Sequence, residues 1–207
     1  ASEDGRWLAA AYSDGLRLWD AETGELERYL EPLSGARHLA WSPDGRWLAV
    51  TRITRISEHM DATVYAEVQL VDLETGQGVV LLSNQIKDVA RAAWGPDGRL
   101  LLLRSFGYTP QQEVTDTVFA AQQLVLWEEG DLRAITPASE REPLDVVALS
   151  WSPDGTRVAM NIEGESEGAR VEIRDALSWE LVQRLDGVRA FACVRQVLRI
   201  LAKEKER

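Results

Sequence analysis

The chain has 207 residues, and 45% of them are hydrophobic, which allows one domain with a substantial core and argues against disorder. Its formal net charge is -11 at pH 7. Because nucleic-acid binding depends mostly on cations that meet phosphates, this charge argues against nucleic acid as a partner. No apolar run approaches the ~18 residues that a membrane span needs.

The cellular compartment is left open by the sequence. The first residues lack the basic and apolar regions of a signal peptide, and the single cysteine, Cys193, slightly favours a reducing, cytoplasmic compartment. A periplasmic or extracellular location stays open if a leader was removed.

One turn sequence recurs along the chain. It is abbreviated in Ser2-Glu3-Asp4-Gly5 and complete in the copies that begin at Trp41, Trp94 and Trp151, which read Trp-Ser/Gly-Pro-Asp-Gly. Proline presets φ in such a turn, aspartate bonds to nearby backbone, and glycine accepts the conformation at its end. The four turn glycines are 40, 53 and 57 residues apart, close to one four-stranded propeller blade plus insertions.

Short apolar runs surround each copy of the turn and predict strands. In chain order we expect them within residues 7–11, 16–20, 26–30, 37–41, 46–51, 68–72, 79–82, 89–94, 99–104, 123–127, 132–135, 146–151, 156–161, 171–175 and 180–185. This order predicts an all-β fold, a β-propeller of about four four-stranded blades, with strands a to d counted outward from the channel. The expected blades span about residues 1–35, 36–88, 89–145 and 146–186, within a propeller domain of residues 1–193.

The first blade begins at strand b and lacks an innermost strand of its own. Residues 187–193 match the pattern of residues 35–41, with Cys193 in the tryptophan position, so we expect them to complete that blade and close the ring. Two alternatives stay open: the chain is part of a longer propeller, or two chains form an eight-bladed ring. Residues 194–207 are basic and apolar at helical spacing, which predicts a short amphipathic helix or tail. This helix would serve a partner or membrane surface, or dock on the acidic propeller.

The segments Leu16-Arg17-Leu18-Trp19-Asp20 and Trp41 to Ala49 resemble the WD-repeat family and its TolB-like relatives. The resemblance extends over residues 1 to about 192 and is specific for the fold. The Trp-Asp dipeptide is complete only at Trp19-Asp20, and no Gly-His dipeptide precedes strand a, which favours the looser, bacterial end of the group. The resemblance implies little about function, because these families include scaffolds, receptors, sensors and enzyme accessory domains.

Catalytic and metal-binding motifs are weak. Residues 164–168 read Gly-Glu-Ser-Glu-Gly and match the nucleophile elbow of serine hydrolases, but both histidines, His38 and His59, precede the motif instead of following it. The acidic residues from Glu163 to Glu167 lack the order of a calcium loop, and no cysteine or histidine pair has zinc spacing. We therefore expect no catalytic residue, no metal and no cofactor.

The tryptophans are expected mainly in the core. Trp41, Trp94 and Trp151 occupy equivalent repeat positions, as do Trp19 and Trp127. Trp179 is different, because it stands in a turn between strands c and d where other blades have Thr-Gly. For Trp179 we expect either an exposed contact or partial packing against the blade, and the sequence favours neither.

The unequal connections between strands b and c are the best indication of a binding site. Blade 2 inserts residues 53–65 and blade 3 inserts residues 106–121, and two such loops on neighbouring blades would form a wall beside the channel. The candidate partner-binding residues are His59, Met60, Tyr65, Phe106, Tyr108 and Phe119. The alternative is that strands b and c simply run longer, as twisted hairpins whose aromatic residues pack on each other.

We expect a non-enzymatic scaffold that binds a protein or peptide on the face with these long connections, and a homodimer stays open. The alternative is a sensor or accessory propeller domain of a larger enzyme, such as a prolyl oligopeptidase-like hydrolase.

Overall fold

The computed structural model describes residues 1–30, 33, 35–56, 63–85, 91–108, 119–135, 145–163 and 168–187. Residues 188–207, with the expected closing strand and C-terminal helix, and residues 164–167, with most of the hydrolase-like motif, lie outside these ranges.

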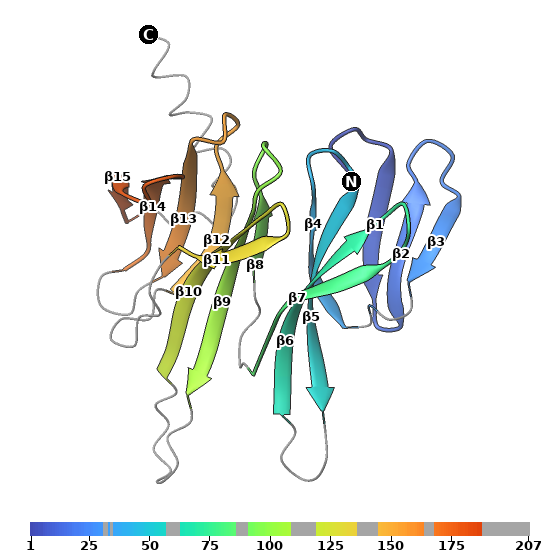
Figure 1. The fold of residues 1–207 in the computed structure, drawn as a ribbon, viewed down its shortest axis with the longest axis horizontal. Coiled ribbons are helices and arrows are strands. Elements are labelled where there is room, and N and C mark those ends of the chain that lie inside the picture. The colour runs from blue at the N-terminus through green and yellow to red at the C-terminus, as the bar shows by residue number, and fades with distance from the viewer. Residues whose placement is uncertain are drawn as a thin grey trace.

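All the regular elements of the described residues are strands, in four antiparallel sheets (Figure 1). The first sheet has three strands, in the order β1 (Trp7–Tyr12), β2 (Gly15–Asp20) and β3 (Leu26–Leu30). The second has four, in the order β4 (Ala36–Trp41), β5 (Trp47–Ile56), β6 (Thr63–Asp72) and β7 (Gly78–Gln85).

The other two sheets repeat the order of the second. The third contains β8 (Arg91–Trp94), β9 (Leu100–Tyr108), β10 (Phe119–Glu128) and β11 (Asp131–Ala134). The fourth contains β12 (Asp145–Trp151), β13 (Arg157–Glu163), β14 (Arg170–Asp175) and β15 (Leu181–Asp186). These four sheets are the blades of a β-propeller, as the sequence predicts.

Successive blades pack through their inner strands. In the described residues β1 lies beside β4, β4 beside β8, and β8 beside β12. Side chains on strand b alternate between the two interfaces of a blade. In β5, for example, Leu48 and Val50 pack with blade 1, whereas Ala49 packs with blade 3. Both faces of a strand b are therefore buried, which explains the continuous apolar run from Leu100 to Leu103.

Repeated tryptophans on the inner strands tie neighbouring blades together. The indole Nε1 of Trp94 donates a hydrogen bond to the Ala40 carbonyl of blade 2 at 3.0 Å, and that of Trp151 donates to the Ala93 carbonyl of blade 3 at 2.9 Å. Trp151 is buried in the core between blades 3 and 4. The expected core role is thus correct for these residues, and the same side chains also supply polar contacts between sheets.

Two other tryptophans behave differently from the buried set. Trp179 packs partly against the core between blades 3 and 4, and its φ of 61° takes the place of the positive φ that Gly24 and Gly76 adopt in the same turn of blades 1 and 2. Trp19 is half-buried and lies on the side of blade 1 that faces away from blade 2, next to Tyr12. No described blade packs on that side, so the core role expected for Trp19 stays a prediction.

The turn of blade 3 is one residue shorter than the others. Trp94 pairs with Leu100, whereas Trp41 pairs with Leu48 and Trp151 with Val158. A side chain at Gly95 would start 3.0 Å from the Trp151 ring, so the serine of the other copies does not fit there. The three copies of the turn look equivalent in sequence, so the shorter turn of blade 3 becomes visible only in the structure.

We predict that burial between blades dominates stability. Leu100 is fully buried between blades 2 and 3, and Leu100→Ala should lower the free energy of unfolding by about 2 to 5 kcal/mol. Leu132 lies on the exposed outer strand of the same blade, and Leu132→Ala should cost less than about 1 kcal/mol. Denaturant unfolding of both variants measures the difference, and equal midpoints would contradict the assignment of the core.

Candidate functional site

Two long hairpins project from the end of the propeller opposite the Asp-Gly turns (Figure 1). In blade 2, β5 and β6 pair continuously from Trp47 with Asp72 to Ile56 with Thr63. In blade 3, β9 and β10 pair from Leu100 with Trp127 to Tyr108 with Phe119. Residues 53–56, 63–65, 106–108 and 119–121, expected in the inserted connections, are therefore strand, as the alternative of longer strands has it. Residues 57–62 and 109–118 lie outside the described residues.

The candidate residues fall at definite register positions on these hairpins. Tyr65 on β6 pairs with Thr54 on β5 and with Gln85 on β7. On the other hairpin, Phe106 pairs with Ala121, and Tyr108 pairs with Phe119. His59 and Met60 lie outside the described residues. The backbone thus brings Phe106, Tyr108 and Phe119 to one hairpin and Tyr65 to its neighbour.

Three basic residues stand at the base of the hairpins, where the inner strands begin. Arg37 and His38 are on β4, and Arg91 is the first residue of the adjacent strand β8. His38 pairs with Thr51 and Arg91 with Leu103, so both lie just below the extended parts of the hairpins. Within the described part of the chain, no ion pair or side-chain hydrogen bond engages these three side chains.

The two arginines act on the pKa of the histidine. Partial burial of the imidazole, and then the charges of Arg91 and Arg37, lower the pKa of His38 below its usual range. The lowered pKa favours the neutral imidazole at pH 7, and the two guanidinium groups carry positive charge. Sequence reasoning did not select these residues, although His38 and Arg91 stand at the same distance before Trp41 and Trp94 and could have been found by comparing repeats.

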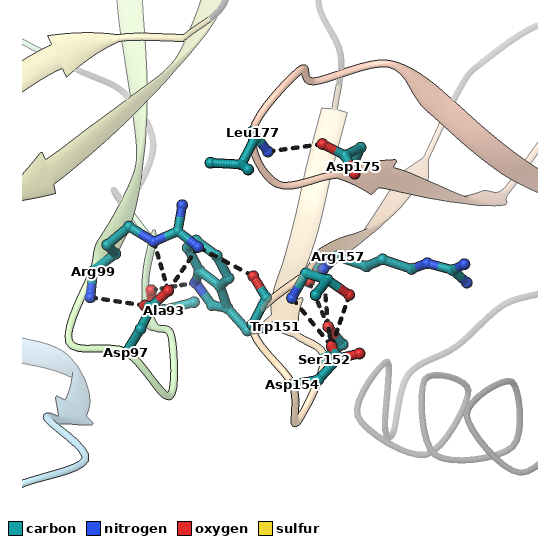
Figure 2. Close-up of polar contacts among 11 residues, drawn as sticks. Ala93, Asp97, Arg99, Trp151, Ser152, Asp154, Arg157, Asp175 and Leu177 are labelled. Carbon is teal, nitrogen blue, oxygen red and sulfur yellow. Dashed lines mark hydrogen bonds and ion pairs between the residues drawn. The ribbon is translucent and has the colours of Figure 1, made fainter.

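The opposite end of the propeller is held by hydrogen bonds within the turns (Figure 2). The Ser152 hydroxyl donates to Asp154 at 2.6 Å and accepts from the backbone amide of Arg157 at 2.9 Å, and Asp154 accepts from the amide of Thr156. The turns at Ser42 and Ser2 repeat this arrangement. These serine and aspartate side chains satisfy the turn backbone, which is a structural role.

Blade 3 uses an arginine instead of a serine at this end. Arg99 bonds to Asp97 at 2.7 Å, reaches the Gly155 carbonyl at 3.1 Å and lies 4.8 Å from the centre of the Trp151 ring (Figure 2). The contact fastens the turn of blade 3 to that of blade 4. Because the Arg99 guanidinium group already contacts a carboxylate, a carbonyl and an aromatic ring, it is poorly placed to bind a ligand.

Buried charge elsewhere is also neutralised. The Glu172 carboxylate on β14 is buried, with Arg170 at 3.0 Å and Arg174 at 2.8 Å. Burial alone would raise the pKa of Glu172, but the hydrogen bonds from Arg174 and Arg170 outweigh this effect and lower it. An ionised, doubly paired carboxylate is a poor general acid or base at neutral pH.

In the described ranges no three His, Cys, Asp or Glu side chains gather in a way that could hold a metal ion. Within these ranges, no helix has the length and apolar character that crossing a membrane requires.

Comparison with known proteins supports the fold. No family model matches the chain, and no curated protein matches it. Among solved structures, hydrazine synthase of Kuenenia stuttgartiensis superposes with a TM-score of 0.62 at 16% identity, over 89% of this chain and 60% of that one. TolB from Acinetobacter baumannii gives 0.56 at 18% identity, over 88% of this chain and 41% of that one.

A structure from a study of two prolyl endopeptidases gives a TM-score of 0.61 at 14% identity, over 91% of this chain and 29% of that one. This chain thus spans less than two thirds of the length of each of these three neighbours. At such identities the similarity shows a shared β-propeller fold and does not distinguish WD-repeat from TolB-like ancestry.

We predict that the hydrogen bonds of the Asp-Gly turns make stability acid-sensitive. The Ser152 hydroxyl and the Thr156 amide lower the pKa of Asp154 from 3.8 to about 2. A lowered pKa in the folded state means that the ionised group stabilises the fold above pH 3.8 and that this contribution is lost as pH falls toward about 2. Ser152→Ala removes the largest of these interactions, so its stability deficit should narrow as the pH falls through this window.

The measurement is the melting temperature of the wild type and of Ser152→Ala between about pH 5 and pH 2. Ser178→Ala is the matched control, because its hydroxyl makes a longer bond, 3.2 Å, to Asp175 in another turn. A Ser152→Ala deficit that stays constant across the range would refute the link to Asp154 ionisation.

Proposed function

We propose that the protein is a non-enzymatic scaffold that binds a peptide or protein segment at the hairpin end of the propeller. The observation that carries the proposal is the coincidence of two features on adjacent blades: extended hairpins with aromatic residues at Tyr65, Phe106, Tyr108 and Phe119, and arginines at their base. Aromatic and arginine residues are the usual carriers of binding energy in protein interfaces.

The charges suggest the chemistry of the partner. Arg37 and Arg91 are cations in a chain whose net charge is -11, and neither is paired with a described carboxylate. A peptide carboxylate can accept two parallel hydrogen bonds from a guanidinium group. We therefore propose a segment with an acidic side chain or a free carboxyl terminus beside an apolar residue.

An enzymatic role is less well supported. The serine and aspartate side chains of the turns form hydrogen bonds to each other and to the turn backbone, and Glu172 forms ion pairs with Arg170 and Arg174. The accessory-domain alternative rests on structural neighbours that include peptidases, and similarity at 14% identity carries the fold alone.

The proposal is tested with peptides selected from a random display library on the wild-type protein. The selected peptides should be enriched in acidic residues, and the double variants Phe106→Ser with Tyr108→Ser and Arg37→Gln with Arg91→Gln should each weaken their binding at least about tenfold. The arginine contribution should shrink as salt is raised, because exposed charges are screened.

Asp44→Asn is the control at the opposite end, and its peptide affinity should equal that of the wild type. Melting temperatures within a few degrees of the wild type establish that the hairpin variants are folded. Peptides that bind all variants equally, or that lose binding only with Asp44→Asn, would show that the hairpin end is not the recognition surface.

A further inference from the structure

One face of blade 1 is apolar and uncovered, and it occupies the position of an interface between blades. Leu8, Leu48, Leu100 and Val158 stand at the same register position, each opposite the residue that precedes the acidic residue at the end of strand c. Leu48, Leu100 and Val158 each pack against the preceding blade and are 0% exposed, whereas Leu8 is 45% exposed. Blade 1 therefore carries the surface that other blades bury, with no described blade against it.

Two cross-strand rows and a tyrosine form this surface, which we name the blade 1 face. Leu8 pairs with Trp19 and Trp19 with Leu26, and Ala10 pairs with Arg17 and Arg17 with Tyr29. Tyr12 lies at the end of β1, and its ring is 6.2 Å from that of Trp19. Tyr12, Leu26 and Tyr29 are 47%, 53% and 42% exposed.

The polar groups of the face are already arranged. The Arg17 guanidinium lies over the rings of Tyr12 and Tyr29, at 4.4 and 4.9 Å, and makes two hydrogen bonds to Asp14 at 2.8 and 2.9 Å. The Tyr29 hydroxyl donates to the Asp14 carbonyl at 2.8 Å. The cation is thus neutralised and its flat side chain is fixed, so burying the face leaves no unpaired charge and orders little additional side-chain freedom.

The interfaces within the chain indicate what fits the blade 1 face. Every equivalent face is covered by another antiparallel sheet that presents apolar side chains, such as Leu16 and Leu18 of blade 1 against Leu48 of blade 2. The occupant that matches is a second β-sheet face. The far side of blade 4 does not offer one, because its central residues Ala159, Val171 and Ile173 are already 0% exposed.

We propose that the blade 1 face is a self-association surface, and that a second copy of this chain covers it with its own blade 1 face. A two-fold interface requires a surface that can meet a copy of itself, and apolar rows of leucine, tryptophan and tyrosine around a paired arginine can do so without bringing unpaired like charges together. The composition is that of interface centres, which are rich in aromatic residues and arginine and poor in unpaired charge. Two chains of net charge -11 meet here at a surface where the Arg17 and Asp14 charges cancel.

Sedimentation equilibrium tests the proposal. The wild type should reach twice the 23.1 kDa mass of one chain as concentration rises. Leu8→Glu with Leu26→Glu places like charges on both sides of the two-fold interface and should weaken dimerisation at least about tenfold. Val80→Glu with Val182→Glu is the matched control, since it makes the same change of charge at exposed valines on β7 and β15 and should leave the dimer intact.

Hydrogen exchange locates the interface independently of any substitution. Amides of β1 and β3 should be better protected at high than at low protein concentration, with no such change in β7 or β15. A wild type of single-chain mass at all concentrations would overturn the proposal, because the blade 1 face is then not covered by a second copy. A dimer that resists the Leu8 and Leu26 substitutions, or whose protection maps elsewhere, would equally overturn it.

Discussion

The burial of sheet faces against one another is the constraint on which the rest of this structure depends. Blades 2 and 3 are each covered on both faces by a neighbouring blade, so their strands b are apolar on both sides. The result is seen in β9 of blade 3. Leu100 and Leu102 face blade 2, whereas Leu101 and Leu103 face blade 4. A single polar substitution in such a strand would therefore disturb one interface while leaving the other nearly intact.

The turns and tryptophans set the spacing that this burial requires. Hydrogen bonds from Trp94 to Ala40 and from Trp151 to Ala93 join the inner strands of neighbouring blades. The serine hydroxyls and aspartate carboxylates of the Asp-Gly turns form hydrogen bonds within the turns, so these polar groups are already satisfied. Connections at the hairpin end can vary in length and side chains while the scaffold stays fixed.

Most of the fold could be predicted from the sequence because its signals are local. Turn residues and short apolar runs mark strand ends, and each predicted strand of the described residues lies within a few residues of the observed one. The hairpin lengths were harder, because residues 53–56 and 106–108 carry no turn signal that separates a longer strand from a loop. The shorter turn of blade 3 was hidden as well, since Gly95 replaces serine for a reason that lies in another blade, the nearby ring of Trp151.

The site was less predictable than the fold for the same reason. Aromatic residues in long connections are visible in a sequence, but the placing of Arg37 and Arg91 on neighbouring strands depends on β4 lying beside β8. Trp19 and Leu8 look like core residues by every local criterion, and only the arrangement of the blades shows that the side they face is uncovered. Properties that depend on which sheet neighbours which are therefore beyond a reading of single repeats.

The two proposed surfaces belong to different parts of the fold, which bears on how they would work together. The hairpins extend along the strands of blades 2 and 3, whereas the blade 1 face is a sheet surface built from β1, β2 and β3. Closing the blade 1 face against a second copy uses none of the residues at Tyr65, Phe106, Tyr108 or Phe119. A two-fold assembly would then carry two hairpin ends in one particle, and a partner with two suitable segments would bind more tightly through a raised effective concentration, with no new contact at either end.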